Sequence, residues 1–338
     1  MRIVIVGAGA IGGMIGVKLA LAGEDVTFVC RGANLQAVQM NGMKLITEDG
    51  AELLASPVKA IERIADAGVQ ELVILSMKAH QVAPVVKDLR SVFGPGTIAL
   101  TMQNGIPWWY FQKLPGRFEG TRLETVDPGG VISANIEVER VIGCVVYPAS
   151  EMVSPGVIRV IEGNRFAVGE LDGADTPRVR MVSELFQKAG FKSPVLNDIR
   201  SEIWLKLWGN SSFNPISALT HATLADICQF PPSRALAARM MAEAQTIGEK
   251  LGAHFRVPLD RRIAGAEAVG RHKTSMLQDV EHGRTLELDA LIGAVVELGR
   301  LTQTPAPHID AVYACASLLA KTLQEEHGRL RIEKLREV

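Results

Sequence analysis

The chain has 338 residues, 47% of them hydrophobic, and its 36 basic and 37 acidic residues leave a net charge of −1. This length suits two domains, and the balanced charge gives no reason to expect a nucleic acid or an anionic membrane as a partner. The four cysteines, at positions 30, 144, 228 and 315, form no CxxC pair, so we expect buried thiols in a reducing cytoplasm.

The chain opens with a predicted strand at 2–6, apolar and β-branched from Ile3 to Val6, that leads into a turn with GxGxxG spacing. A strand, a glycine turn and a helix in this order are typical of a dinucleotide-binding site. The turn is therefore predicted to bind the pyrophosphate of a cofactor at the helix N-terminus, through the backbone of Gly7, Ala8, Gly9, Ala10, Ile11 and Gly12. The segment also resembles a secretory signal, but five glycines and Lys18 argue against that reading.

The second predicted strand, at 26–29, ends at Cys30 and Arg31. An enzyme that uses NAD usually has an acidic residue here, which holds the ribose 2′-hydroxyl. A guanidinium instead matches a phosphate in charge and geometry. Arg31 therefore favours NADP(H), the alternative being a solvated loop arginine.

Further apolar runs at 43–46, 71–75 and 97–101 alternate with helical stretches, which predicts an α/β domain of Rossmann type with a mostly parallel, doubly wound sheet. The loops that follow the runs at 71–75 and 97–101 should border the cofactor, because ligands bind at the carboxyl ends of such strands. Later runs at 141–147, 157–161 and 165–169 are expected to be antiparallel, since their turns are short.

From Asp198 onward the pattern is helical, so we place the domain boundary near residue 196 and expect an all-α domain over 197–338. The first helix places Lys206, Asn210 and Asn214 on one narrow stripe with Ser217, among apolar residues. A lysine and two amides can hold a carboxylate and protonate a carbonyl oxygen. The alternative is an exposed lysine with amides that satisfy backbone groups.

Pro215 is expected to kink this first helix. Further along, Glu287 is expected on an apolar helical face, either as part of a buried ion pair or as a site residue. The seven histidines form no clustered ligand set, and no metal is expected.

Seven segments in order resemble the ketopantoate reductase (2-dehydropantoate 2-reductase) family over nearly the whole chain. They are GAGAIG at 7–12, Arg31, SMKAHQV at 76–82, QNG at 103–105, WLKLWGNSSFNP at 204–215, SMLQD at 275–279 and TLELD at 285–289. The resemblance implies NADPH-dependent reduction of ketopantoate, a 2-keto acid, to pantoate, as in pantothenate biosynthesis.

By the same resemblance, Lys206 would be the general acid. Glu287, the second catalytic candidate, would bind the nicotinamide ribose and help to position the lysine. The remaining roles are carried over by position: Arg31, Lys78 and Gln81 on the adenosine phosphate side, Asn104 between cofactor and substrate, and Asn210, Asn214 and Ser275 on the substrate carboxylate and hydroxyl.

The chain departs from the family pattern after QNG, where Trp108, Trp109 and Tyr110 begin a segment that looks extended as far as Gly143. These aromatics could reshape the pocket, seal a dimer contact or cover the sheet edge. The apolar stretch 290–301 is a second candidate surface for a homodimer.

Three other functions stay open at this point: reduction of a different 2-keto acid, an opine-type dehydrogenase, and a non-catalytic NADP(H) sensor. An opine-type enzyme would call for a catalytic His/Asp pair, where this chain has Lys206. A sensor has no need of a proton donor.

Overall fold

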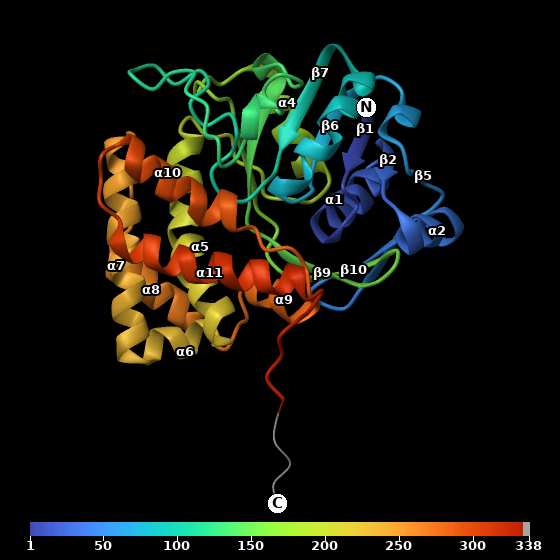
Figure 1. The fold of residues 1–338 in the computed structure, drawn as a ribbon. Coiled ribbons are helices and arrows are strands. Elements are labelled where there is room, and N and C mark those ends of the chain that lie inside the picture. Colours follow the sequence, from blue (N-terminus) through green and yellow to red (C-terminus); the bar gives the residue numbers. More distant parts are fainter. Residues whose placement is uncertain (334–338) are drawn as a thin grey trace, which may run out of the picture. The chain divides into compact units, whose positions relative to one another are not determined.

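The computed structural model describes residues 1–333, and the chain divides into two compact units between Ile199 and Arg200, close to the expected boundary near residue 196. The first unit is α/β with a mostly parallel sheet, and the second is helical throughout its described part (Figure 1). This is the predicted fold class.

A seven-stranded sheet forms the centre of the first unit, in the order β11-β8-β7-β6-β1-β2-β5. Each neighbouring pair is parallel except β11 with β8. The strand interiors are almost fully buried, as expected for a parallel sheet that is covered on both faces. The strands are β1 (Arg2–Val6), β2 (Asp25–Val29), β5 (Lys59–Ile61), β6 (Gln70–Leu75), β7 (Phe93–Thr101), β8 (Val141–Val146) and β11 (Phe166–Gly169).

A second sheet, in the order β4-β3-β10-β9, corrects the prediction for the strand at 43–46. That strand forms with the predicted bounds, but it joins this small sheet instead of the large one, because a tight turn at 47–51 pairs it antiparallel with β4. Its other neighbour, β10, runs parallel to it. The strands are β3 (Met43–Ile46), β4 (Glu52–Ala55), β9 (Ala149–Ser154) and β10 (Val157–Glu162); β4, β5 and β9 were not predicted.

The expected antiparallel directions hold for β11 against β8 and for β10 against β9. They are wrong for β8, which runs parallel to β7. The long connection between these two strands returns the chain to the end of the sheet where β7 began, and this allows a parallel neighbour.

Helix α1 (Ala10–Leu21) lies between the two sheets, with contacts to strands of both. It is therefore apolar on nearly all sides, which explains its weak amphipathic pattern. Lys18 places its ammonium group 4.7 Å from the centre of the Phe191 ring. The other helices of this unit are α2 (Gly32–Asn41), α3 (Val86–Leu89) and α4 (Pro177–Lys188).

The segment after QNG is not extended as predicted: it consists of turns and two short 3-10 helices, Pro128–Gly130 and Val138–Arg140. Its aromatic residues, Trp108 to Phe111, are buried. The Trp109 indole donates to the Thr101 hydroxyl at 2.9 Å, so this ring covers the end of β7. Three roles were expected for these aromatics: reshaping the pocket, sealing a dimer contact or covering the sheet. Trp109 covers the sheet.

The second unit contains helices α5 to α11. Tertiary packing centres on Trp204 and Trp208 of α5, whose rings lie 6.3 and 4.8 Å from that of Phe255. The stretch 290–301 is largely buried within the unit, and a homodimer would have to form on another surface. The helices are α5 (Ile199–Thr220), α6 (Leu224–Gln229), α7 (Pro231–Lys250), α8 (Leu259–Ala268), α9 (Ser275–His282), a π-helix (Asp289–Gly293), α10 (Ala294–Leu301) and α11 (Pro307–Glu325).

Among residues 1–333, no helix combines the length and the apolar character that crossing a bilayer requires.

A buried ion pair gives a test of the first unit's packing. Glu170 is 3% exposed and accepts from Arg178 at 2.7 and 2.5 Å and from the Thr176 hydroxyl at 2.5 Å. The hydrogen bonds from Arg178 to Glu170 raise the pKa of Arg178, although burial opposes them. Arg178→Met leaves a buried carboxylate without its cation, and we expect it to lower the free energy of unfolding by about 3–5 kcal/mol.

The measurement is urea unfolding followed by circular dichroism, with Arg180→Met as the control. Arg180 makes similar bonds to Asp175, but both side chains are exposed, so little change is expected. An equal loss of unfolding free energy in the two variants would contradict the idea that burial makes the Arg178–Glu170 pair important for stability.

Candidate active site

The glycine turn between β1 and α1 has one open position and two crowded ones. Gly7 has a φ of +100°, and a Cβ there would lie 2.9 Å from the Met77 nitrogen. A Cβ on Gly12 would lie 2.3 Å from the Gly7 carbonyl oxygen. Gly9, in contrast, has an extended backbone and nothing within 4 Å of its Cβ position.

The N-terminus of α1 follows this open position. Its N-cap residue is Gly9, so no N-cap side chain is present to bond the first backbone N–H groups. Its first backbone N–H groups have no partner within the helix and carry the positive end of the helix dipole. An open backbone beside such a helix end fits the pyrophosphate of a dinucleotide.

Three side chains that the sequence reading missed hold this turn and the loops beside it. The Ser76 hydroxyl donates to the Gly7 carbonyl at 2.9 Å, and the Asn34 amide donates to the Ala8 carbonyl at 2.9 Å. The Gln103 amide donates to the carbonyls of Leu75 and Met77 at 2.7 and 3.1 Å. Ser76 and Gln103 lie in the two loops that were expected to border the cofactor. Their position in these loops is the sequence signal that could have identified them.

Cys30 and Arg31 lie at the end of β2, with Arg31 exposed directly before α2. Burial raises the pKa of Cys30 to about 11, so the thiol stays neutral at physiological pH. A neutral thiol and a cation therefore stand where an NAD enzyme usually has a carboxylate. This combination suits a phosphate group.

Lys78, Gln81 and Asn104 follow β6 and β7. The Lys78 backbone N–H donates to the Gln81 side chain at 3.1 Å across a 3-10 turn. Asn104 is half-buried in the loop that Gln103 ties to the end of β6. Since β7, β6, β1 and β2 are parallel neighbours, the structure brings these residues, the glycine turn and Arg31 to one edge of the sheet.

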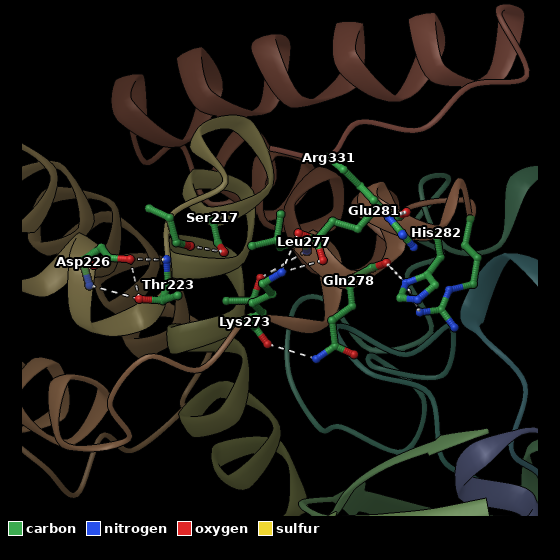
Figure 2. Close-up of polar contacts among 12 residues, drawn as sticks. Ser217, Thr223, Asp226, Lys273, Leu277, Gln278, Glu281, His282 and Arg331 are labelled. Atoms are coloured by element: carbon green, nitrogen blue, oxygen red, sulfur yellow. Dashed lines mark hydrogen bonds and ion pairs between the residues drawn. The ribbon is translucent and has the colours of Figure 1, made fainter. Parts of the chain in front are cut away.

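In the second unit, α5 carries Lys206, Asn210 and Asn214 at four-residue spacing. Lys206 and Asn210 are half-buried, and Asn214 is 6% exposed. The helix continues through Pro215 to Thr220 without interruption. Ser217, the fourth residue of the stripe, donates its hydroxyl to the Ala222 carbonyl at 2.6 Å (Figure 2), so it stabilises the helix end.

Ser275 is the exposed first residue of α9. This helix of two turns is held at both ends by the contacts that Figure 2 shows. At the start, the Thr274 hydroxyl accepts from the Leu277 N–H at 3.3 Å. Lys273 forms an ion pair of 2.7 Å with Glu281, and Arg331 donates to the Glu281 carbonyl at 2.8 Å. The position of Ser275 is therefore well defined within this unit.

The placement of Glu287 on an apolar helical face was wrong. Glu287 is half-buried in a non-helical segment between α9 and the helical residues that begin at Leu288. The reason is Gly283, which ends α9 in the left-handed conformation with a φ of +65°. Among the described residues, no group of three or more His, Cys, Asp and Glu side chains could hold a metal ion.

Comparison with known proteins gives matches over most of the chain. The family model described as ketopantoate reductase PanE/ApbA matches residues 3–173, and the model of the C-terminal part of the same family matches 198–320. The 2-dehydropantoate 2-reductase of Mesorhizobium japonicum is 55% identical over 95% of this chain and 98% of its own.

Solved structures show the same fold. A protein of Ralstonia solanacearum MolK2, named provisionally as a ketopantoate reductase, is 41% identical with a TM-score of 0.90 over 96% of this chain and 98% of its own. A D-mandelate dehydrogenase solved with NADH and anilino(oxo)acetate is 19% identical with a TM-score of 0.82 over 96% of this chain and 100% of its own, and it shares the fold. The chain thus belongs to the ketopantoate reductase family.

Proposed function

We propose that this protein is an NADPH-dependent 2-dehydropantoate 2-reductase that converts ketopantoate to pantoate in the cytoplasm, as in pantothenate biosynthesis. The observation that carries the proposal is the 55% identity, over nearly both full lengths, to the M. japonicum protein of that name. In this proposal the domain over 1–196 binds NADP(H), and the helical domain over 197–338 supplies the substrate and catalytic residues.

Cofactor binding is assigned to residues at the carboxyl edge of the large sheet. The backbone of Gly7 to Gly12 would hold the pyrophosphate, and the open space at Gly9 supports this. Arg31, Lys78 and Gln81 would contact the adenosine phosphate side, and Asn104 the nicotinamide side. Glu287, which belongs to the helical unit and not to the sheet, would contact the nicotinamide ribose. NADPH, when bound, supplies the hydride that reduces the carbonyl carbon.

Lys206 is assigned as the general acid. Its ammonium group would stabilise the negative charge that develops on the carbonyl oxygen and then donate the proton that completes the hydroxyl group. Asn210, Asn214 and Ser275 would hold the carboxylate and hydroxyl of the substrate. Support comes from Asn214, which is 6% exposed, because a buried amide group is costly unless it gains a hydrogen bond.

A different 2-keto acid is the second candidate substrate. The observation that favours this candidate is the buried aromatic segment shortly after Asn104. It borders the loop assigned to substrate binding and departs from the pattern of the family.

The first prediction tests enzyme class and substrate together. The protein should consume NADPH when ketopantoate is added, measured by absorbance against a panel of 2-keto acids. Lys206→Ala should lower kcat by about 10²–10⁴-fold, since a general acid contributes that much. Its Kd for NADPH should stay within about twofold, because binding is assigned to other residues.

Lys321→Ala is the control, since Lys321 is an exposed lysine on α11. Turnover with another 2-keto acid alone would reassign the substrate. Tight NADPH binding with no turnover of any acid would contradict the enzyme and favour a sensor.

The second prediction concerns Arg31. Arg31→Ser should lower kcat/KM for NADPH by about 10–100-fold, because a charge-assisted hydrogen bond contributes about 1.5–3 kcal/mol. The value for NADH should change little, since NADH lacks the 2′-phosphate. Arg63→Ser, at an exposed arginine of the same unit, is the control, and an equal loss with both cofactors would refute the assignment.

The third prediction separates two glycines of the turn. Gly9→Ala should raise the Kd for NADPH at least tenfold without lowering Tm, because its methyl group enters open space in the assigned pyrophosphate site. Gly12→Ala should lower Tm, since its methyl group meets the Gly7 carbonyl oxygen at 2.3 Å. Unchanged NADPH affinity in Gly9→Ala would place the pyrophosphate elsewhere.

A further inference from the structure

The guanidinium group of Arg262, on α8, lies against the surface of α5 at Gly209. A Cβ on Gly209 would lie 3.2 Å from Arg262 Cζ, and closer still to its Nη2 atom. The guanidinium group can therefore lie this close to α5 only because residue 209 has no side chain. Glycine in the middle of a helix is less stable than alanine, and the contact with Arg262 gives a physical reason for glycine at this position.

The contact lies on the side of α5 that carries the proposed proton donor. Gly209 follows Lys206 by three residues and directly precedes Asn210. Residues three apart in an α-helix are neighbours on its surface, with about 5–6 Å between their Cβ atoms. All these residues belong to the helical unit. Arg262 thus brings a second cation beside Lys206.

Packing within the helical unit fixes the helix that carries Arg262. Ile263 and Ala266 of α8 are 2% and 3% exposed. Near its C-terminal end, Glu267 forms an ion pair of 3.2 Å with Arg234 of α7. Arg262 itself is half-buried, so part of its surface stays open to solvent. The cation is therefore carried by a fixed element and remains accessible.

The charges on this side of α5 favour an anion. Lys206 and Arg262 are both half-buried cations, and like charges close together repel unless an anion lies between them. Glu202, four residues before Lys206, is a 2% exposed carboxylate, but its charge is matched by an ion pair with Arg256. An anionic ligand would offset the remaining repulsion.

A 2-keto acid supplies an anion of the right shape. Its carboxylate is bonded directly to the keto carbon, so a cation beside Lys206 can reach the carboxylate while Lys206 bonds the keto oxygen. The groups assigned above to the carboxylate and hydroxyl, on Asn210, Asn214 and Ser275, are all neutral. A guanidinium group keeps its charge at any physiological pH and presents paired N–H donors that match a carboxylate.

We propose that Arg262 binds the carboxylate of the 2-keto acid, and that it thereby selects acids over uncharged carbonyl compounds. The inference rests on the proposed function and adds a specificity residue to it.

The test compares ketopantoate with its primary amide, which has nearly the same shape and no charge. The measured quantity is the ratio of kcat/KM for the acid to kcat/KM for the amide. We expect this ratio to fall by about 10–100-fold in Arg262→Gln, the size that a hydrogen bond between charged groups contributes. Arg262→Lys should lower it less, because lysine keeps the charge but not the paired donors. Arg261→Gln, at the exposed arginine next to it on α8, is the matched control and should leave the ratio unchanged.

A second variant displaces the guanidinium group without removing it. In Gly209→Ala the new methyl group occupies the space beside Arg262 Cζ and Nη2, and the flexible arginine side chain has to move away. The acid-to-amide ratio should fall, by less than in Arg262→Gln. The Tm should not fall, since alanine is the better helix former. A purely structural role for Arg262 predicts the opposite pattern, a lower Tm in Arg262→Gln with an unchanged ratio.

Binding gives a readout that does not depend on turnover. Calorimetry on the protein saturated with NADP⁺ should show a lower Kd for pantoate than for its primary amide, and Arg262→Gln should remove most of this preference. The inference is overturned if the unmodified protein does not prefer the acid, or if the preference is unchanged in Arg262→Gln. Absence of NADPH consumption with every keto acid in the unmodified protein would instead overturn the proposed function, so the two failures are distinguishable.

Discussion

The close approach of α1 to the strands beside it is the constraint on which the first unit depends. Cβ atoms on Gly12 and Gly16 would lie 2.3 Å from the Gly7 carbonyl oxygen and 2.1 Å from the Phe28 ring, so only glycine allows the helix to lie this close. Because α1 also contacts the small sheet, its position fixes both layers. The same packing holds the helix N-terminus beside the open position at Gly9, where a bound anion would meet free N–H groups.

Rigidity has a comparable role in the second unit. Trp204 and Trp208 anchor α5 against Phe255, and the Trp208 indole donates to the Met241 carbonyl at 2.7 Å. The polar stripe therefore lies on a helix whose rotation is fixed by large buried rings. In the proposed function, such an element would keep the geometry of the assigned proton donor and amide groups set before the substrate arrives, which is how electrostatic catalysis avoids the cost of reorganisation.

Two errors of the sequence reading have the same physical origin. The strand at 43–46 was recognised but assigned to the wrong sheet, and Glu287 was recognised but placed on a helix. A hydrophobic pattern spans only a short window, whereas the structure in both cases depends on a turn near that window. The turn at 47–51 and the left-handed Gly283 each redirect the chain, and their effect on pairing is not visible in hydrophobic periodicity.

The sequence by itself determined the class of each unit, the glycine turn, the cation at the end of the second strand and the polar stripe around Lys206. These features depend on spacing within a few residues, and strand or helix periodicity makes them readable. Only the tertiary structure decided the pairing of the sheets and the roles of Ser76, Asn34 and Gln103, whose bonds join loops far apart in the chain. It also distinguished Trp109, which finds Thr101, from Trp108, because a hydrogen-bond partner is set by three-dimensional proximity and not by neighbouring letters.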